Sequence, residues 1–175
     1  MEQLHNYLLE LEKELSRKIG FFPLSSGPEI SWHQFIFAPP FDFPSILVIE
    51  QSYSITTIAF AIVDLTGDPF GRNRGWQNIS EVQADKSEKL SALFMELRPD
   101  LLPDTDTTGQ TGLIGCYTYQ KGGSRHSFQL FNPDRDSSPN HIAWLYGAIE
   151  LAQITFAERR PQKYLQVLNY YLSNK

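Results

Sequence analysis

Cysteine is almost absent from this chain of 175 residues. The one cysteine, Cys116, excludes an internal disulfide and a zinc site built from several cysteines. The chain also lacks the run of about 18 apolar residues that a transmembrane helix requires. Its first residues, MEQLHNYLLELEKEL, are charged from residue 2 and contain no apolar signal core. We therefore expect a soluble, cytoplasmic protein that does not contact a membrane.

Positively charged residues are also fewer than negatively charged ones. Fifteen Lys and Arg residues stand against twenty Asp and Glu residues, for a net charge of −5. An acidic protein repels phosphate backbones, so we expect no nucleic-acid partner. A basic protein or a small molecule suits this charge better. Hydrophobic residues make up 41% and aromatic residues 13% of the chain, which is typical of a folded protein, and the length fits one domain over residues 1–175.

Signatures of well-known catalytic and cofactor sites are missing. The stretch GDPFGRNRGWQNIS (67–80) has glycines four residues apart, which is neither a dinucleotide fingerprint nor a phosphate-binding loop. The acidic loops around Asp104 and Asp136 depart from the calcium-loop pattern at required positions. The four histidines show no metal-binding spacing. We therefore predict no catalytic set, no metal and no cofactor.

The pattern of apolar residues predicts four helices. The first covers residues 3–18, where leucines recur at helical spacing. The second begins at Ser80, which has capping-box spacing to Gln83, and stops before Pro99. The third, over residues 139–158, is apolar almost all round and is expected to be buried or to lie in an interface. The fourth begins at Pro161.

Five segments read as strands. Three lie in residues 29–37, 45–50 and 55–65, and the last of them is so apolar that we place it centrally in the sheet. Two more form a hairpin around Gly122 and Gly123, with residue 121 opposite 124. Residues 66–79 are then a connecting loop. The fold class is therefore α+β, with a largely antiparallel, hairpin-linked five-stranded sheet packed against about four helices, two of them C-terminal.

Several side chains are candidates for chemistry or binding. Arg and Trp are common at interface hot spots, so the loop 67–80 is a candidate contact, although a long loop whose tryptophan packs on the core and whose arginines offset nearby acids is the simpler explanation. Cys116 and His126 do not form a dyad in the expected hairpin, because they point to opposite faces. Glu150 is the single charge inside the third helix, which suggests either a buried acid, paired for instance with Arg125, or a point where that helix reaches solvent.

The leading functional hypothesis is a non-enzymatic protein-binding module. One form is an immunity- or inhibitor-type protein that neutralises a basic partner such as a toxin, an analogy that rests on charge and size. Its expected partner-binding residues are Phe41, Arg72, Arg74, Trp76, Asp104 and Asp106.

Two alternatives stay open. The first is a small-ligand enzyme or sensor with a pocket between sheet and helices, using Glu150, His126 and Arg74. The second is a structural subunit whose helix 139–158 is buried in a homo-oligomer.

Overall fold

The computed structural model describes residues 2–19, 28–64, 75–105, 112–133 and 135–173, with side chains in the first helix described for residues 6–15. These residues form one antiparallel six-stranded sheet in the order β4-β3-β2-β1-β5-β6. The strands are β1 (Ser31–Ala38), β2 (Ser45–Gln51), β3 (Thr56–Ile62), β4 (Trp76–Glu81), β5 (Ile114–Lys121) and β6 (Ser124–Phe131). The α+β class with an antiparallel sheet is confirmed.

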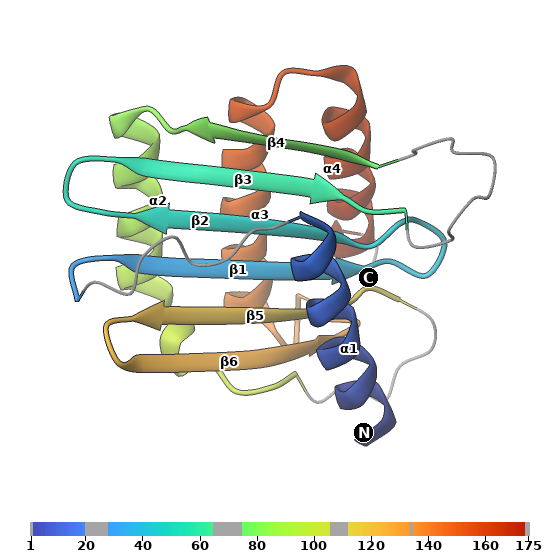
Figure 1. The fold of residues 1–175 in the computed structure, drawn as a ribbon. Helices are drawn as coiled ribbons and strands as arrows, with labels where there is room; N and C mark the ends of the chain where they lie inside the picture. The colour runs from blue at the N-terminus through green and yellow to red at the C-terminus, as the bar shows by residue number, and fades with distance from the viewer. Residues whose placement is uncertain (1, 20–27, 65–74, 106–111, 134, 174–175) are drawn as a thin grey trace.

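Helices cover both faces of this sheet (Figure 1). The helix α1 (Glu2–Ile19) lies on one face, and α2 (Ala84–Leu97), α3 (Pro139–Thr155) and α4 (Arg159–Ser173) lie on the other. A short 3-10 helix, η1 (Pro99–Leu101), follows α2. The two C-terminal helices and the N-terminal helix were expected from their apolar patterns.

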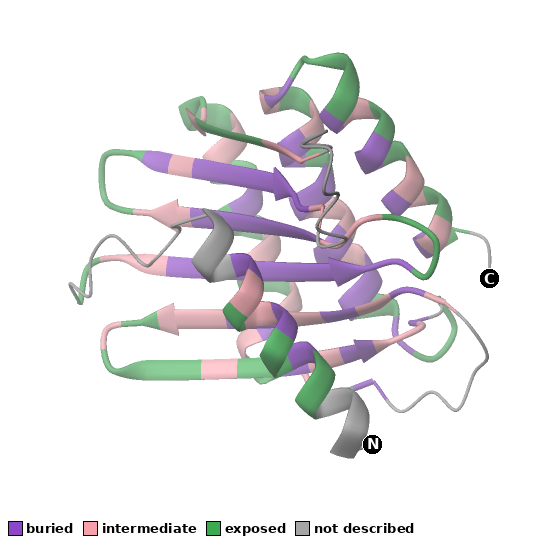
Figure 2. Cartoon of the chain, turned by 45° about the vertical axis from the view of Figure 1, so that its right-hand side comes forward, coloured by how far each residue is buried: buried purple, intermediate pink, exposed green. Residues whose placement is uncertain are grey.

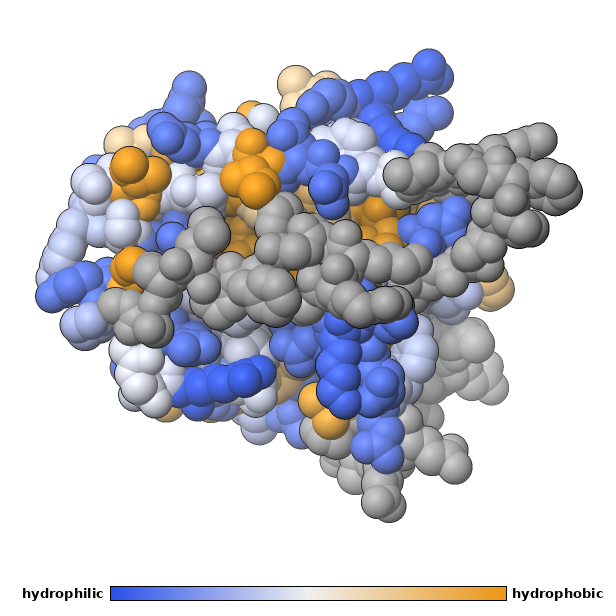
Figure 3. All heavy atoms as spheres, in the orientation of Figure 1, coloured by the Kyte–Doolittle hydropathy of each residue, from blue (hydrophilic) through white to orange (hydrophobic). Residues whose placement is uncertain are grey.

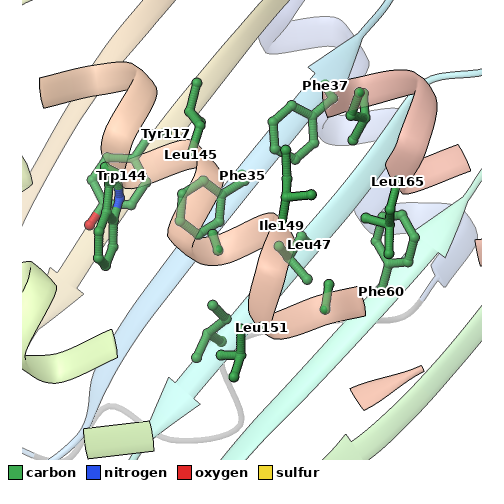
Figure 4. Close-up of a cluster of buried hydrophobic side chains, with 14 of the residues drawn as sticks. Phe35, Phe37, Leu47, Phe60, Tyr117, Trp144, Leu145, Ile149, Leu151 and Leu165 are labelled. Carbon is green, nitrogen blue, oxygen red and sulfur yellow. The ribbon is translucent and has the colours of Figure 1, made fainter. Parts of the chain in front are cut away.

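The main core lies between the sheet and the helices α2, α3 and α4. Phe35, Leu47 and Phe60 face inward from three neighbouring strands and are completely buried, and α3 packs Leu145 and Ile149 against them (Figure 4). The nearly uniform apolar surface of α3 is explained by this position between the sheet and its neighbouring helices. The sequence-based expectation of a buried third helix is met inside the single chain.

A second, smaller core lies under α1. Leu8, Leu11 and Leu15 pack onto the opposite face of the central strands. The buried Gln34 of β1 donates from Nε2 to Oε1 of Glu12, at 2.7 Å. This polar contact fixes α1 on the sheet, because a buried amide left without a partner is costly. Figure 2 shows that burial is concentrated in β1, β2 and β3, while β4 is largely exposed.

The expectation of five strands was wrong by one. The sixth strand, β4, lies in the stretch expected to be a connecting loop, and it pairs with β3 from Thr57↔Glu81 to Ile62↔Trp76. Four of its six residues are polar, so it has no strong alternation of apolar residues. An edge strand with one neighbour and wide solvent exposure does not need that alternation.

The second helix starts later than expected. Ser80 belongs to β4, where its hydroxyl donates to the carbonyl of Glu81 at 3.3 Å, and the helix begins at Ala84 with Gln83 at the N-cap. A serine with capping-box spacing can sit in a strand, because the same side chain also bonds to local backbone. The strand β3 was expected at the centre of the sheet. It is an interior strand, but it lies second from the edge, next to β4.

Candidate functional site

A polar groove lies where one end of the sheet meets α2. In Figure 1 this is the side of the β2–β3 turn and the β5–β6 turn. The groove has a volume of about 470 Å³ and takes residues from the start of β1, the end of β2, the start of β3, the end of β5 and one face of α2. Its polar lining includes Ser31, Gln51, Thr56, Ser87 and Ser91.

A hydrogen-bond network joins the floor of this groove. Gln51 Nε2 donates to Ser87 Oγ at 3.3 Å and to Ser91 Oγ at 3.1 Å. The hydroxyls of Thr56 and Ser87 are 2.5 Å apart, and Ser91 Oγ donates to the Ser87 carbonyl at 3.0 Å. Ser87 and Ser91 share one face of α2 because they are four residues apart. The network therefore ties α2 to the ends of β2 and β3.

Behind this floor lies His33, which is 1% exposed. Its Nδ1 is 3.0 Å from the hydroxyl of Tyr117. Burial lowers the pKa of His33 to about 4, and a hydrogen bond with the Gln51 side chain opposes that shift. The ring is therefore neutral at pH 7. A neutral imidazole has one N–H donor and one ring-nitrogen acceptor, and the side chains of Tyr117 and Gln51 are the hydrogen-bonding neighbours of this ring.

The hydrogen bonds continue toward the main core. Tyr117 is fully buried, and desolvation raises the pKa of its phenol far above the ordinary value. The indole of Trp144 lies beside it, with ring centres 5.9 Å apart (Figure 4). A line of polar groups thus runs from Tyr117 through His33 and Gln51 to the groove. Such a chain of satisfied bonds holds its members in one arrangement.

Aromatic rings form one wall of the groove. Phe94 and Tyr119 lie 5.0 Å apart between ring centres, and both contact the His33 ring, at 5.3 and 5.1 Å. Both are half-buried and line the groove. The wall therefore presents aromatic surface beside a hydroxyl-rich floor.

The rim combines apolar and charged side chains. Tyr53 is 86% exposed and Met95 is 69% exposed, and both line the groove. The Glu29 carboxylate, which accepts a hydrogen bond from the Tyr53 hydroxyl, raises the pKa of that phenol. Glu88 and Lys121 also line the groove. The rim thus carries two carboxylates and one ammonium group.

Two of the residues predicted for partner binding, Phe41 and Trp76, lie at the opposite end of the sheet. Phe41 follows the end of β1 and is 84% exposed. Trp76 begins β4 and packs its ring 5.8 Å from Phe60 and 5.4 Å from Phe156. Arg72, Arg74 and Asp106 lie outside the described residues.

Asp104 lies beside the other edge of the sheet. Its Oδ1 accepts from the backbone N–H of Gln129 in β6, at 2.6 Å. The edge strands β4 and β6 are separated by five strand spacings, or about 24 Å at ~4.8 Å each. Trp76 and Asp104 are therefore not gathered into one compact patch. Their contact with a partner stays a prediction.

The alternative pocket residues are dispersed as well. Glu150 is exposed on α3, so the interpretation that this helix reaches solvent there fits the structure. His126 bonds through Nε2 to the carbonyl of Leu102 at 2.9 Å. Neither Glu150 nor His126 lines the polar groove. Arg74 lies outside the described residues. Arg125 approaches Glu12, at 3.8 Å, rather than Glu150.

The prediction about Cys116 and His126 is confirmed. The hairpin pairs Lys121 with Ser124 and Tyr119 with His126, as expected from a two-residue turn. Cys116 packs beneath α1, whereas His126 contacts Phe128 of the main core on the other face. Burial raises the pKa of the Cys116 thiol to about 11, so it is a thiol and not a thiolate at pH 7.

The residues of the groove floor were not predicted from the sequence. A usable signal was present in SWHQFIF, where His33 and Gln34 interrupt an apolar strand. Ser87 and Ser91 give a second signal, because their spacing places two hydroxyls on one helix face. Neither signal identifies the partner strand, and only the fold brings Gln51 and Thr56 beside them.

The described residues hold neither a metal cluster nor a membrane span. No three His, Cys, Asp or Glu side chains among them lie close enough to hold a metal ion. In that part of the chain, no helix is long and apolar enough to cross a bilayer. No protein-family model matches the chain, and comparison with curated proteins finds no match.

Proposed function

We propose that this protein is a non-enzymatic protein-binding module for a basic partner, and that the polar groove is its contact surface. The observation that carries the proposal is the set of exposed apolar side chains at the rim. Tyr53, Ile55 and Met95 are 86%, 50% and 69% exposed. Tyr53 and Met95 line the groove, and Ile55 lies in the turn between Tyr53 and Thr56.

This arrangement resembles the general anatomy of protein interfaces. Aromatic residues and methionine are enriched at the centre of such contacts, and polar groups surround them. Exposed apolar side chains beside a hollow are a better sign of binding than single ones scattered over a surface. On the face that α1 covers, hydrophobic residues among the coloured atoms form separate small patches over a largely hydrophilic surface (Figure 3).

The charge of the protein supports a basic partner. The chain has a net charge of −5, and the groove rim contributes Glu29 and Glu88 against Lys121. Complementary charge speeds encounter and rejects unsuitable partners. Neutralisation of a basic enzyme by an inhibitor- or immunity-type protein is the specific form of this function that we propose.

The bonding of the groove hydroxyls supports the non-enzymatic part of the proposal. Ser87 and Ser91 bond to Gln51, to Thr56 and to helix backbone. A nucleophilic serine needs an adjacent base to activate it. His33, the one histidine among the residues that line the groove, bonds to Tyr117 and Gln51 instead.

Partner capture with matched variants tests this proposal. Affinity-tagged wild type and the variants Tyr53→Ser, Met95→Ser and Phe41→Ser are incubated with lysate of the source organism at low and at high salt. We expect one basic protein that is bound by wild type and Phe41→Ser, is lost from the two groove variants, and dissociates at high salt. Retention by the groove variants with loss from Phe41→Ser would move the contact surface to the opposite end of the sheet.

A small-ligand sensor is the second candidate. The groove volume of about 470 Å³ and its hydroxyl-lined floor favour this function, since ligand pockets of a few hundred Å³ often carry a few convergent polar groups. Native mass spectrometry of the protein purified from its own source tests it. A retained small molecule that is lost from Gln51→Leu favours the sensor, and an unliganded mass from freshly isolated protein rejects it.

A further inference from the structure

We propose that the groove receives the guanidinium group of an arginine side chain from the partner protein. This inference rests on the proposed function and names the group that enters the groove. Three observations support it: the balance of donors and acceptors in the floor, the charges at the rim, and the aromatic wall.

In the network of Gln51, Thr56, Ser87 and Ser91, unused acceptors outnumber unused donors. Gln51 donates its amide hydrogens to Ser87 and Ser91, and Ser91 donates its hydroxyl hydrogen to the Ser87 carbonyl. One of the two hydroxyls of Thr56 and Ser87 donates to the other, so one hydroxyl hydrogen of this pair stays unused. Lone pairs remain on Ser91 Oγ, on Thr56 Oγ1 and on the Gln51 oxygen. A ligand that only donates hydrogen bonds therefore fits this floor.

The rim and the wall select a flat cation among such donors. Glu29 and Glu88 supply two carboxylates for charge-assisted bonds. The half-buried rings of Phe94 and Tyr119 supply faces on which a planar guanidinium can stack. Arginine presents five N–H donors in a fixed planar group, whereas lysine presents a compact ammonium that is more strongly hydrated. The ammonium group of Lys121 repels either cation, so removal of its charge should strengthen binding.

The apolar rim indicates that the arginine belongs to a protein. A free guanidinium compound would leave the exposed side chains of Tyr53, Ile55 and Met95 uncovered. A polypeptide that presents arginine between apolar residues would bury them together with the arginine stem. We therefore expect a peptide to bind much more tightly than a free guanidinium compound.

Titration of the full-length, ¹⁵N-labelled protein with short probes tests this inference by NMR. The probes are the capped peptides Leu-Arg-Leu, Leu-Lys-Leu and Leu-citrulline-Leu, together with agmatine. We expect saturable shifts of the amides of Gln51, Ser87, Ser91 and Tyr119 with Leu-Arg-Leu. The lysine peptide, the uncharged citrulline peptide and agmatine should each bind at least tenfold more weakly. Equal binding of citrulline or lysine overturns the guanidinium assignment, and equal binding of agmatine overturns the peptide source.

Substitution of exposed rim charges gives opposite expected effects. Glu29→Gln and Glu88→Gln should each weaken binding of Leu-Arg-Leu about threefold to tenfold, while Lys121→Gln should strengthen it about threefold. Because all three side chains are exposed, the variants should fold as the wild type does. Weakening by Lys121→Gln, or no effect of either glutamate substitution, contradicts the proposed role of the rim.

The two proposals can fail separately. If the arginine peptide does not bind but the captured partner is still lost from Tyr53→Ser and Met95→Ser, the arginine inference fails and the binding function stands. If the arginine peptide binds as expected but no partner depends on the groove, the groove accepts guanidinium and the proposed protein-binding function fails.

Discussion

Tyr117 and His33 lie 84 residues apart in the chain and share a buried hydrogen bond of 3.0 Å between Oη and Nδ1. This bond joins β5 to β1 from within the main core, and His33 in turn bonds to Gln51 at the floor of the groove. The position of the groove floor is thus coupled to side chains that are buried in the interior of the protein.

Tyr117→Phe removes the hydroxyl and leaves His33 Nδ1 without its hydrogen-bond partner. An unsatisfied buried polar atom costs about 1–3 kcal/mol, so we expect the free energy of unfolding in urea to fall by about that amount. Tyr146→Phe is the control, because its hydroxyl makes a long, part-buried contact of 3.5 Å with the Asn169 carbonyl. Equal losses in both variants would contradict a special role for the His33–Tyr117 bond.

The neutral state of His33 makes stability depend on pH. Its pKa is lowered from 6.5 in the unfolded chain to about 4 in the folded protein, so the unfolded state binds the proton first. The stabilisation is complete above pH 6.5 and is lost as pH falls toward 4, by about 3 kcal/mol in total and about 2 kcal/mol by pH 5.

Urea unfolding at pH 7.5 and pH 5 measures this effect. His141, whose pKa is also lowered by burial, contributes in the same direction, so the comparison is with His33→Gln. The variant should show a smaller loss between the two pH values than the wild type. An unchanged loss would assign the pH dependence to other groups.

Gly115 permits close approach of β5 to β1. A Cβ at this position would lie 2.6 Å from the backbone oxygen of Ile36, and a backbone atom in a central sheet cannot turn aside. Gly115→Ala should therefore lower the free energy of unfolding by about 1–3 kcal/mol, as overpacking commonly does. Gly123→Ala meets nothing within 4 Å and should change stability by less than about 0.5 kcal/mol. Thermal unfolding of both variants decides between these expectations.

Thr105 protects the β6 edge of the sheet. Thr105 Oγ1 accepts from the backbone N–H of Phe131 at 2.8 Å, and Thr105 is 4% exposed. Thr105→Val keeps the shape but leaves this donor unpaired, so we expect a loss of about 1–3 kcal/mol. Thr155→Val, which removes only a donation to the Leu151 carbonyl on α3, is the control. Binding of the arginine peptide should be unchanged in both variants, because neither residue lines the groove.

Strong local patterns allowed much of the fold to be predicted from the sequence. The leucine spacing of α1, the Gly122–Gly123 turn and the apolar surface of α3 each determine an element by themselves. The strand β4 lacked such a pattern, because an exposed edge strand tolerates polar residues such as Gln77 and Asn78. The capping-box spacing at Ser80 also misled, since a serine bonds to local backbone in strands as well.

The groove could not be predicted for a different reason. Its floor joins Gln51, Thr56 and Ser87, which come from two strands and a helix, and none of them is unusual in its own segment. Their meeting depends on the register of β2 with β3 and on where α2 crosses the sheet end. Trp76, by contrast, is conspicuous in its own segment, yet its ring packs on Phe60 and Phe156.

The most direct test of the central claim is photo-crosslinking in the source organism, with benzoylphenylalanine placed at Tyr53 or, in a matched variant, at Phe41. Both positions are more than 80% exposed, so the probe should not disturb folding. We expect the probe at position 53 to yield one adduct with a basic protein, and the probe at position 41 to yield none. An adduct from position 41 without one from position 53 would contradict the assignment of the groove as the contact surface.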